Sequence, residues 1–153
     1  MMLRLSIAAL HLVSMVLGVT FLVQRANSLR VAQSAQDLSK VLFWDNLYGL
    51  VAIAWLGSGM MRAFSGLEKG SDYYLHNHVF WSKLLFVAVL LASEAPVMVA
   101  LIRLRVNRAR HRDVDVASFR KLVRLHWYEL IAVVFAVIAA TLMARGVGYV
   151  APK

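Results

Sequence analysis

Four apolar segments, each about 20 residues long, constrain the fold of this chain more than any other feature. A helix rises about 1.5 Å per residue, so about 20 residues match the roughly 30 Å hydrocarbon core of a bilayer. We place the segments at residues 5–24, 41–61, 79–102 and 125–144. The sequence therefore predicts an all-α fold, an integral membrane four-helix bundle in which residues 1–153 form a single transmembrane domain.

Composition supports a membrane protein and restricts its chemistry. Apolar residues make up 61% of the chain, whereas a soluble domain carries about 45–50% even when Gly is included. The chain has no cysteine, which excludes disulfides, thiolate ligands and thiol nucleophiles. Ligands for a cofactor or metal would then come from His, Asp, Glu, Tyr or Met.

In the third segment, Pro96 lacks an N–H group and predicts a bend.

Basic residues are concentrated at one end of the predicted spans. Eleven lie there, eight of them in residues 103–124: Arg25, Arg30, Lys40, Arg103, Arg105, Arg108, Arg110, Arg112, Arg120, Lys121 and Arg124. Because loops rich in Lys and Arg stay in the cytoplasm, we expect the basic loop 103–124 to be cytoplasmic and both termini periplasmic. The net charge of +9 then reflects topology and attraction to anionic membrane lipid. Without interleaved aromatic residues, the loop does not favour nucleic-acid binding.

Polar residues inside apolar segments are the main indication of function, since a charge at the centre of a spanning helix costs roughly 2.5–3.5 kcal/mol. One group lies toward the outer side: His11, Arg62, His76 and Lys83. We expect these residues to line a pocket that opens outward. His11 and His76 are candidate ligands of a metal or cofactor, Arg62 is a candidate cofactor-binding residue, and Lys83 is the candidate catalytic residue.

Each of these residues also has a structural interpretation. His11 can be a core histidine whose ring bonds a carbonyl or hydroxyl group on the next helix. Lys83, near the start of a span, can extend its ammonium group outward to water. His76 and His78 would point about 200° apart in a helix, so only an extended segment would bring both rings to one metal ion.

A second polar group lies toward the inner side: Asp45, Glu94, His126 and Glu129. His126 and Glu129 are i, i+3 neighbours on one helix face, and the four residues together can form a proton or ion relay. In the structural alternative, carboxylates near helix starts complement the helix dipole and a nearby arginine such as Arg25 neutralises them. Glu94 lies roughly 16 Å along the helix axis from Lys83, so it needs another partner or a proton.

A distinctive motif, GLEKGSDYYLHNHVFWSK, runs from Gly66 to Lys83. With this motif as its most specific part, the chain resembles over nearly its whole length a family of small bacterial membrane proteins of unknown function. The resemblance implies a four-helix protein of the bacterial inner membrane.

A more distant resemblance concerns the order of three elements: a histidine early in the first span, a Trp-Gly element ending the second, and a His-to-Lys element opening the third. This order is similar to HemJ-type membrane protoporphyrinogen oxidases and, more loosely, to CopD-type copper-resistance domains. The resemblance to the HemJ-type proteins implies bound haem b and functional roles at His11 and Lys83.

Three functions follow as hypotheses. The first is a haem- or porphyrin-binding redox protein, a HemJ-like oxidoreductase, with His11 and His76 as axial ligands and with Lys83 and Arg62 reaching propionates or a substrate carboxylate. The second is a non-catalytic accessory subunit that docks on a larger membrane complex, or a homodimer. The third is a metal or ion transport component that uses Asp45 and Glu94.

Overall fold

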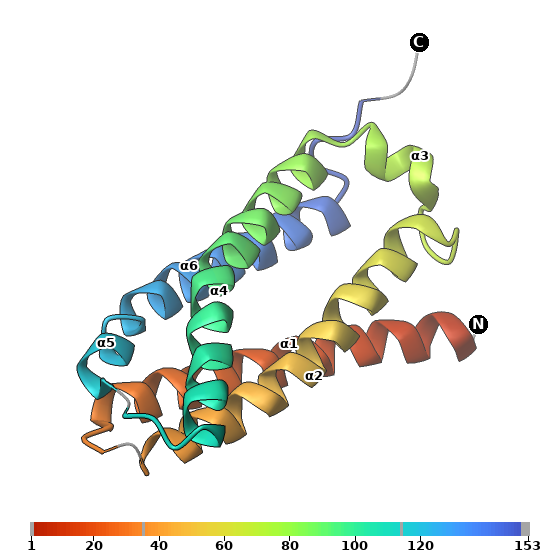
Figure 1. Cartoon of the computed structure of the whole chain (residues 1–153). Helices are drawn as coiled ribbons and strands as arrows, with labels where there is room; N and C mark the ends of the chain where they lie inside the picture. The colour runs from red at the N-terminus through yellow and green to blue at the C-terminus, as the bar shows by residue number, and fades with distance from the viewer. Residues whose placement is uncertain (1, 35, 114, 151–153) are drawn as a thin grey trace.

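The computed structural model describes residues 2–34, 36–113 and 115–150 (Figure 1). Within them the chain forms the helices α1 (Met2–Val31), α2 (Leu38–Phe64), α3 (Gly70–Leu75), α4 (His78–Ala109), α5 (Val116–Arg120) and α6 (Val123–Ala144). No β-strand occurs in this part of the chain, apart from an isolated bridge between Asn77 and Tyr149. Four helical stretches, Met2–Val31, Leu38–Phe64, His78–Ala109 and Val116–Ala144, are long and apolar enough to cross a membrane. The predicted all-α fold with four spans is confirmed.

The helices continue beyond the apolar segments from which they were predicted. α1 runs on to Val31 and therefore contains Arg25, while α4 runs on to Ala109 and contains Arg103 and Arg105. Much of the predicted basic loop is thus helical. The physical reason is that Arg is a good helix former, so a charged residue ends an apolar run without ending the helix.

The long helices are arranged as two pairs. α1 packs along α2 and α4 packs along α6, with further contacts of α1 to α6 and α5. Figure 1 shows the pairs converging at the end where α5 lies and diverging toward the end where α3 lies. α4 changes direction near its middle (Figure 1), and Pro96 lies inside it, as the predicted bend requires.

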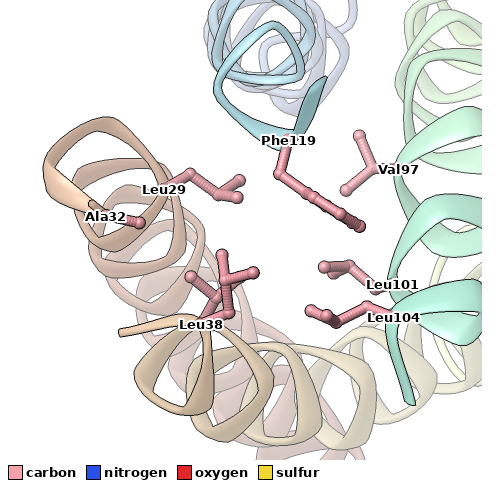
Figure 2. Close-up of a cluster of buried hydrophobic side chains, with 8 residues drawn as sticks. Leu29, Ala32, Leu38, Val97, Leu101, Leu104 and Phe119 are labelled. Atoms are coloured by element: carbon pink, nitrogen blue, oxygen red, sulfur yellow. The ribbon is translucent and has the colours of Figure 1, made fainter. Parts of the chain in front are cut away.

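The convergent end is closed by a cluster of buried apolar side chains. Its members come from α1, α2, α4, α5 and the connection after α1: Leu29, Ala32, Leu38, Val41, Val97, Leu101, Leu104 and Phe119. Figure 2 shows Phe119 of α5 pointing into the space between Leu29 and Leu101. Burial of this apolar surface holds the ends of the two helix pairs together.

At the divergent end, the start of α4 and the residues after α6 are held by Asn77. The Asn77 side chain, which has no exposed area, accepts hydrogen bonds from the backbone N–H groups of Val79 and Phe80 and donates to the carbonyl of Val147. The backbone N–H of His78 also donates to the carbonyl of Gly148. One side chain therefore both caps α4 and fixes the segment that follows α6.

Replacing Gly148 with Ala tests this connection. Gly148 has a φ of +83°, and a Cβ atom there would lie 2.5 Å from Val79 Cγ2 and 2.9 Å from Asn77 Oδ1. Gly146 has a φ of +82° with no heavy atom within 4 Å of such a Cβ, so Gly146→Ala is a matched control. Both variants carry the cost of left-handed backbone, about 1–2 kcal/mol, but only Gly148→Ala also disturbs the Asn77 cap, which adds about 1 kcal/mol.

We therefore expect thermal unfolding in detergent to give a lower Tm for Gly148→Ala than for Gly146→Ala. Equal Tm values for the two variants would show that the Asn77 connection does not contribute to stability.

Candidate functional site

A cavity of about 540 Å³ lies between the two helix pairs at the divergent end. Its polar lining residues come from α1, α2, α3, α4, α6 and the segment between α2 and α3: His11, Trp55, Arg62, Glu68, Lys69, Tyr73, Tyr74, Lys83 and Thr141. The rest of its wall is mainly apolar. Apolar cavities of roughly 300–1,000 Å³ with a few polar groups are typical of small-molecule sites. We call this the outer cavity.

His11 is buried and held in one orientation by α2. Its Nδ1 lies 3.1 Å from the carbonyl oxygen of Trp55 and 3.1 Å from Ser58 Oγ, and its ring stacks on Trp55 at a centroid distance of 5.8 Å. A carbonyl oxygen only accepts hydrogen bonds, so Nδ1 carries the proton and donates it. Nε2 therefore has a free lone pair in a residue that lines the outer cavity.

The close packing of His11 on α2 depends on a small residue. A Cβ atom at Gly59 would lie 3.1 Å from His11 Cε1 and 3.5 Å from His11 Nδ1, whereas one at Gly57 would meet no atom within 4 Å. Gly59 thus provides the space in which the imidazole ring sits.

Three cations and one carboxylate line the outer cavity. Arg62 Nε donates to Glu68 Oε1 at 2.6 Å, and Lys69 Nζ lies 3.1 Å from the hydroxyl of Tyr73 and 4.3 Å from the centroid of its ring. Lys83 is half-buried and forms no ion pair with any described residue. The cavity wall therefore has a surplus of positive charge, which favours an anionic ligand.

Glu68 lies between α2 and α3 and is held ionised by its neighbours. Partial burial raises the pKa of the Glu68 carboxyl, but hydrogen bonds from Arg62 and Tyr74 outweigh it and lower the pKa below its ordinary value. Tyr74 donates its hydroxyl proton to Glu68 Oε2 at 3.0 Å. Burial, together with this hydrogen bond, raises the pKa of Tyr74 to about 12, so the hydroxyl stays a donor.

His76 occupies a different place from the other predicted outer residues. It ends α3, its side chain is 44% exposed, and its Nδ1 lies 3.2 Å from the Asp72 carboxylate and 2.9 Å from the Asp72 carbonyl oxygen. Neither His76 nor His78 lines the outer cavity. Within the described residues, no group of three or more His, Asp or Glu side chains could hold a metal ion. The structure thus brings together His11, Arg62 and Lys83, but not His76.

The four predicted inner residues meet around one arginine, Arg25 of α1, whose side chain has no exposed area. Arg25 Nε donates to His126 Nε2 at 2.9 Å, and Nη1 donates to Asp45 Oδ1 and Glu94 Oε1 at 2.8 Å each. Nη2 donates to Glu94 Oε2 and, at 3.5 Å, to Glu129 Oε2. We call Arg25 and these four partners the Arg25 cluster. It joins α1, α2, α4 and α6.

Two further contacts define the charge state of the Arg25 cluster. Arg105 Nη2 donates to Asp45 Oδ2 at 2.7 Å. His126 Nδ1 lies 3.0 Å from the carbonyl oxygen of Leu122, so Nδ1 carries a proton while Nε2 accepts from Arg25. His126 is therefore neutral in this arrangement.

The sequence predicts Arg25 only as a neighbour of the inner carboxylates and not as the centre of their cluster, because the apolar run ends at Gln24. A usable signal was present in the helix periodicity. His11, Ser14 and Gly18 share one face of α1, and a step of seven residues from Gly18 along that face reaches Arg25. The buried residues of α1 include His11, Ser14 and Arg25, so the two sites lie along one helix face.

Residues 3–148 match the model of the family described as "Predicted membrane protein (DUF2214)". The chain belongs to the DUF2214 family. No curated protein and no solved structure matches it. The matched region of this DUF2214 protein includes the whole outer cavity and the whole Arg25 cluster.

Because the Glu68 pKa is lowered in the folded protein, its ion pair contributes stability above the pKa of an unfolded Glu, about 4.3, and loses it as the pH falls through the folded value. We expect acidification from about pH 6 to about pH 3 to lower the Tm of the wild type more than that of Glu68→Gln. Tyr74→Phe should reduce the difference, whereas Tyr73→Phe should not, since Tyr73 donates to the carbonyl of Met143 instead. Parallel Tm curves for wild type and Glu68→Gln would contradict this assignment.

Proposed function

We propose that this membrane protein binds haem b, or a closely related tetrapyrrole, in the outer cavity, and that it has a redox role. The observation that carries the proposal is the state of His11. Its Nδ1–H is fixed by a backbone carbonyl, which leaves the Nε2 lone pair free in a residue that lines a cavity of about 540 Å³. Histidines that bind metals commonly have this arrangement, because the second hydrogen bond orients the ring and raises its basicity.

The remaining wall of the outer cavity offers contacts both for the macrocycle of such a ligand and for its propionates. Apolar and aromatic side chains, among them Trp55 and Phe80, offer contact to the faces of a planar macrocycle. Lys83 and Lys69 offer positive charge to its propionates, while Arg62 is already paired with Glu68. When bound, haem would supply one-electron redox chemistry.

The lining of the outer cavity contains one histidine, His11, so the proposal assigns one ligand of the iron from this chain. His76, the expected second ligand, is held by Asp72 outside the cavity. His11 would hold the iron, and Lys83 would offer its ammonium group to the carboxylate of a substrate or of the cofactor.

A second candidate is a non-catalytic subunit of a larger membrane complex. The outer cavity between the helix pairs favours it, because side chains of a partner protein could enter that cavity. The two candidate functions predict different occupants of the outer cavity, a tetrapyrrole or a partner protein. Purified wild type and variants therefore distinguish between them.

The test is an absorption spectrum of the protein purified in mild detergent and titrated with haemin. We expect a Soret band in the wild type, its loss in His11→Ala, and its retention in His76→Ala, which removes a histidine outside the cavity. Lys83→Gln should weaken haemin binding roughly tenfold, equivalent to about 1.4 kcal/mol. A wild type that binds no haemin, or an unchanged band in His11→Ala, would end the proposal.

A pair of glycine variants gives an independent test of the same geometry. Gly59→Ala would require the His11 ring to move by a few tenths of an ångström, whereas Gly57→Ala adds a methyl group to the same helix without meeting another side chain. We expect a shifted Soret band or weaker haemin binding for Gly59→Ala only. A colourless wild-type protein that instead co-purifies with one large membrane partner would favour the accessory-subunit alternative.

A further inference from the structure

The Arg25 cluster contains more negative groups than positive ones. Its acidic members are Asp45, Glu94 and Glu129, and the guanidinium groups that contact them are those of Arg25 and Arg105. His126 adds no charge, because its Nε2 accepts a hydrogen bond from Arg25. With all three carboxyls ionised, the cluster would hold an uncompensated negative charge within the membrane-spanning helices, which is costly.

One carboxyl of the cluster is held much more weakly than the other two. Arg25 has five N–H donors, and its contacts with His126, Asp45, Glu94 and Glu129 use all of them. Asp45 and Glu94 accept hydrogen bonds with both of their oxygens. Glu129 has one distant contact, at 3.5 Å, and its Oε1 is buried with no hydrogen-bond partner among the described residues.

The unpartnered Oε1 does not suit a metal ion. Arg25 occupies the centre of the cluster, and the described residues provide no group of three or more metal-ligating side chains. The titratable and charged groups in and around the Arg25 cluster come from every packed element: Arg25, Asp45, Tyr48, Glu94, Arg105 and His126. A proton is the ligand that would balance the charge without displacing Arg25.

We propose that the Arg25 cluster is a proton-binding site, with the proton on Glu129. Protonation of Glu129 forms one O–H bond and brings the charge of the cluster to zero. Release breaks this O–H bond, returns the proton to bulk water and leaves Glu129 ionised next to Arg25. The proposal does not depend on the ligand of the outer cavity, so it stands or falls separately from haem binding.

Infrared spectroscopy of the purified protein at neutral pH tests the protonated carboxyl directly, because the C=O stretch of a carboxylic acid is separate from that of a carboxylate. We expect such a band in the wild type and its loss in Glu129→Gln. Glu68→Gln is the matched control, since it removes a carboxyl already held ionised by Arg62, and it should keep the band. A wild type without the band, or a band that persists in Glu129→Gln, would overturn the proposal.

A second variant tests the charge balance itself. In Glu94→Gln, two carboxyls remain against two guanidinium groups, so Glu129 should ionise and the band should disappear, although Glu129 is still present. Persistence of the band in folded Glu94→Gln would show that burial alone, and not charge balance, protonates Glu129. Circular dichroism establishes that each variant is folded. If neither variant folds, the wild-type spectrum still decides whether a protonated carboxyl exists.

Discussion

The buried guanidinium of Arg25 is the interaction on which the arrangement of the four spanning helices depends. A membrane interior offers no water to unsatisfied polar groups, so an arginine in a spanning helix must find all of its acceptors within the protein. Arg25 finds them on α2, α4 and α6, at donor to acceptor distances that are mostly below 3 Å. A single side chain of α1 thereby fixes the position and rotation of the other three helices at one depth.

The same constraint explains why the bundle is closed at one end and open at the other. Beside the Arg25 cluster, Leu29, Leu101 and Phe119 pack into the apolar cluster that closes the convergent end (Figure 2). Farther along, no comparable buried polar contact joins α2 to α4 among the described residues, and the helix pairs separate around the outer cavity. α3 contacts both α2 and α4 and so bridges the divergent end.

Much of this structure could be predicted from the sequence, because hydrophobic length and periodicity determine membrane helices. The four spans and the common level of His11 and Lys83 follow from positions along apolar runs, and the bend of α4 follows from the missing N–H group of Pro96. The role of Arg25 could not be predicted in this way, because a charged residue just after an apolar run indicates the end of a span. The helix in fact continues, and it places Arg25 on the same face as His11.

The position of His76 shows a second limit of sequence reasoning. Its spacing of seven residues from Lys83 suggests a shared helix face, but the chain breaks its helix at Asn77, which caps α4. His76 therefore belongs to the end of α3, and Asp72, four residues earlier, holds its ring. Spacing predicts a shared face only within one unbroken helix, and a capping Asn between two positions is the signal that separates them.

The most direct test of the account is the thermal stability of Arg25→Lys in detergent. Lysine keeps the positive charge but has three donors in place of five, so it cannot satisfy Asp45, Glu94, Glu129 and His126 together. We expect a loss of stability on the order of 3 kcal/mol. Arg103→Lys, at an exposed position of α4, should stay within about 0.5 kcal/mol of the wild type. An Arg25→Lys protein with the Tm of the wild type would contradict the claim that this guanidinium organises the bundle.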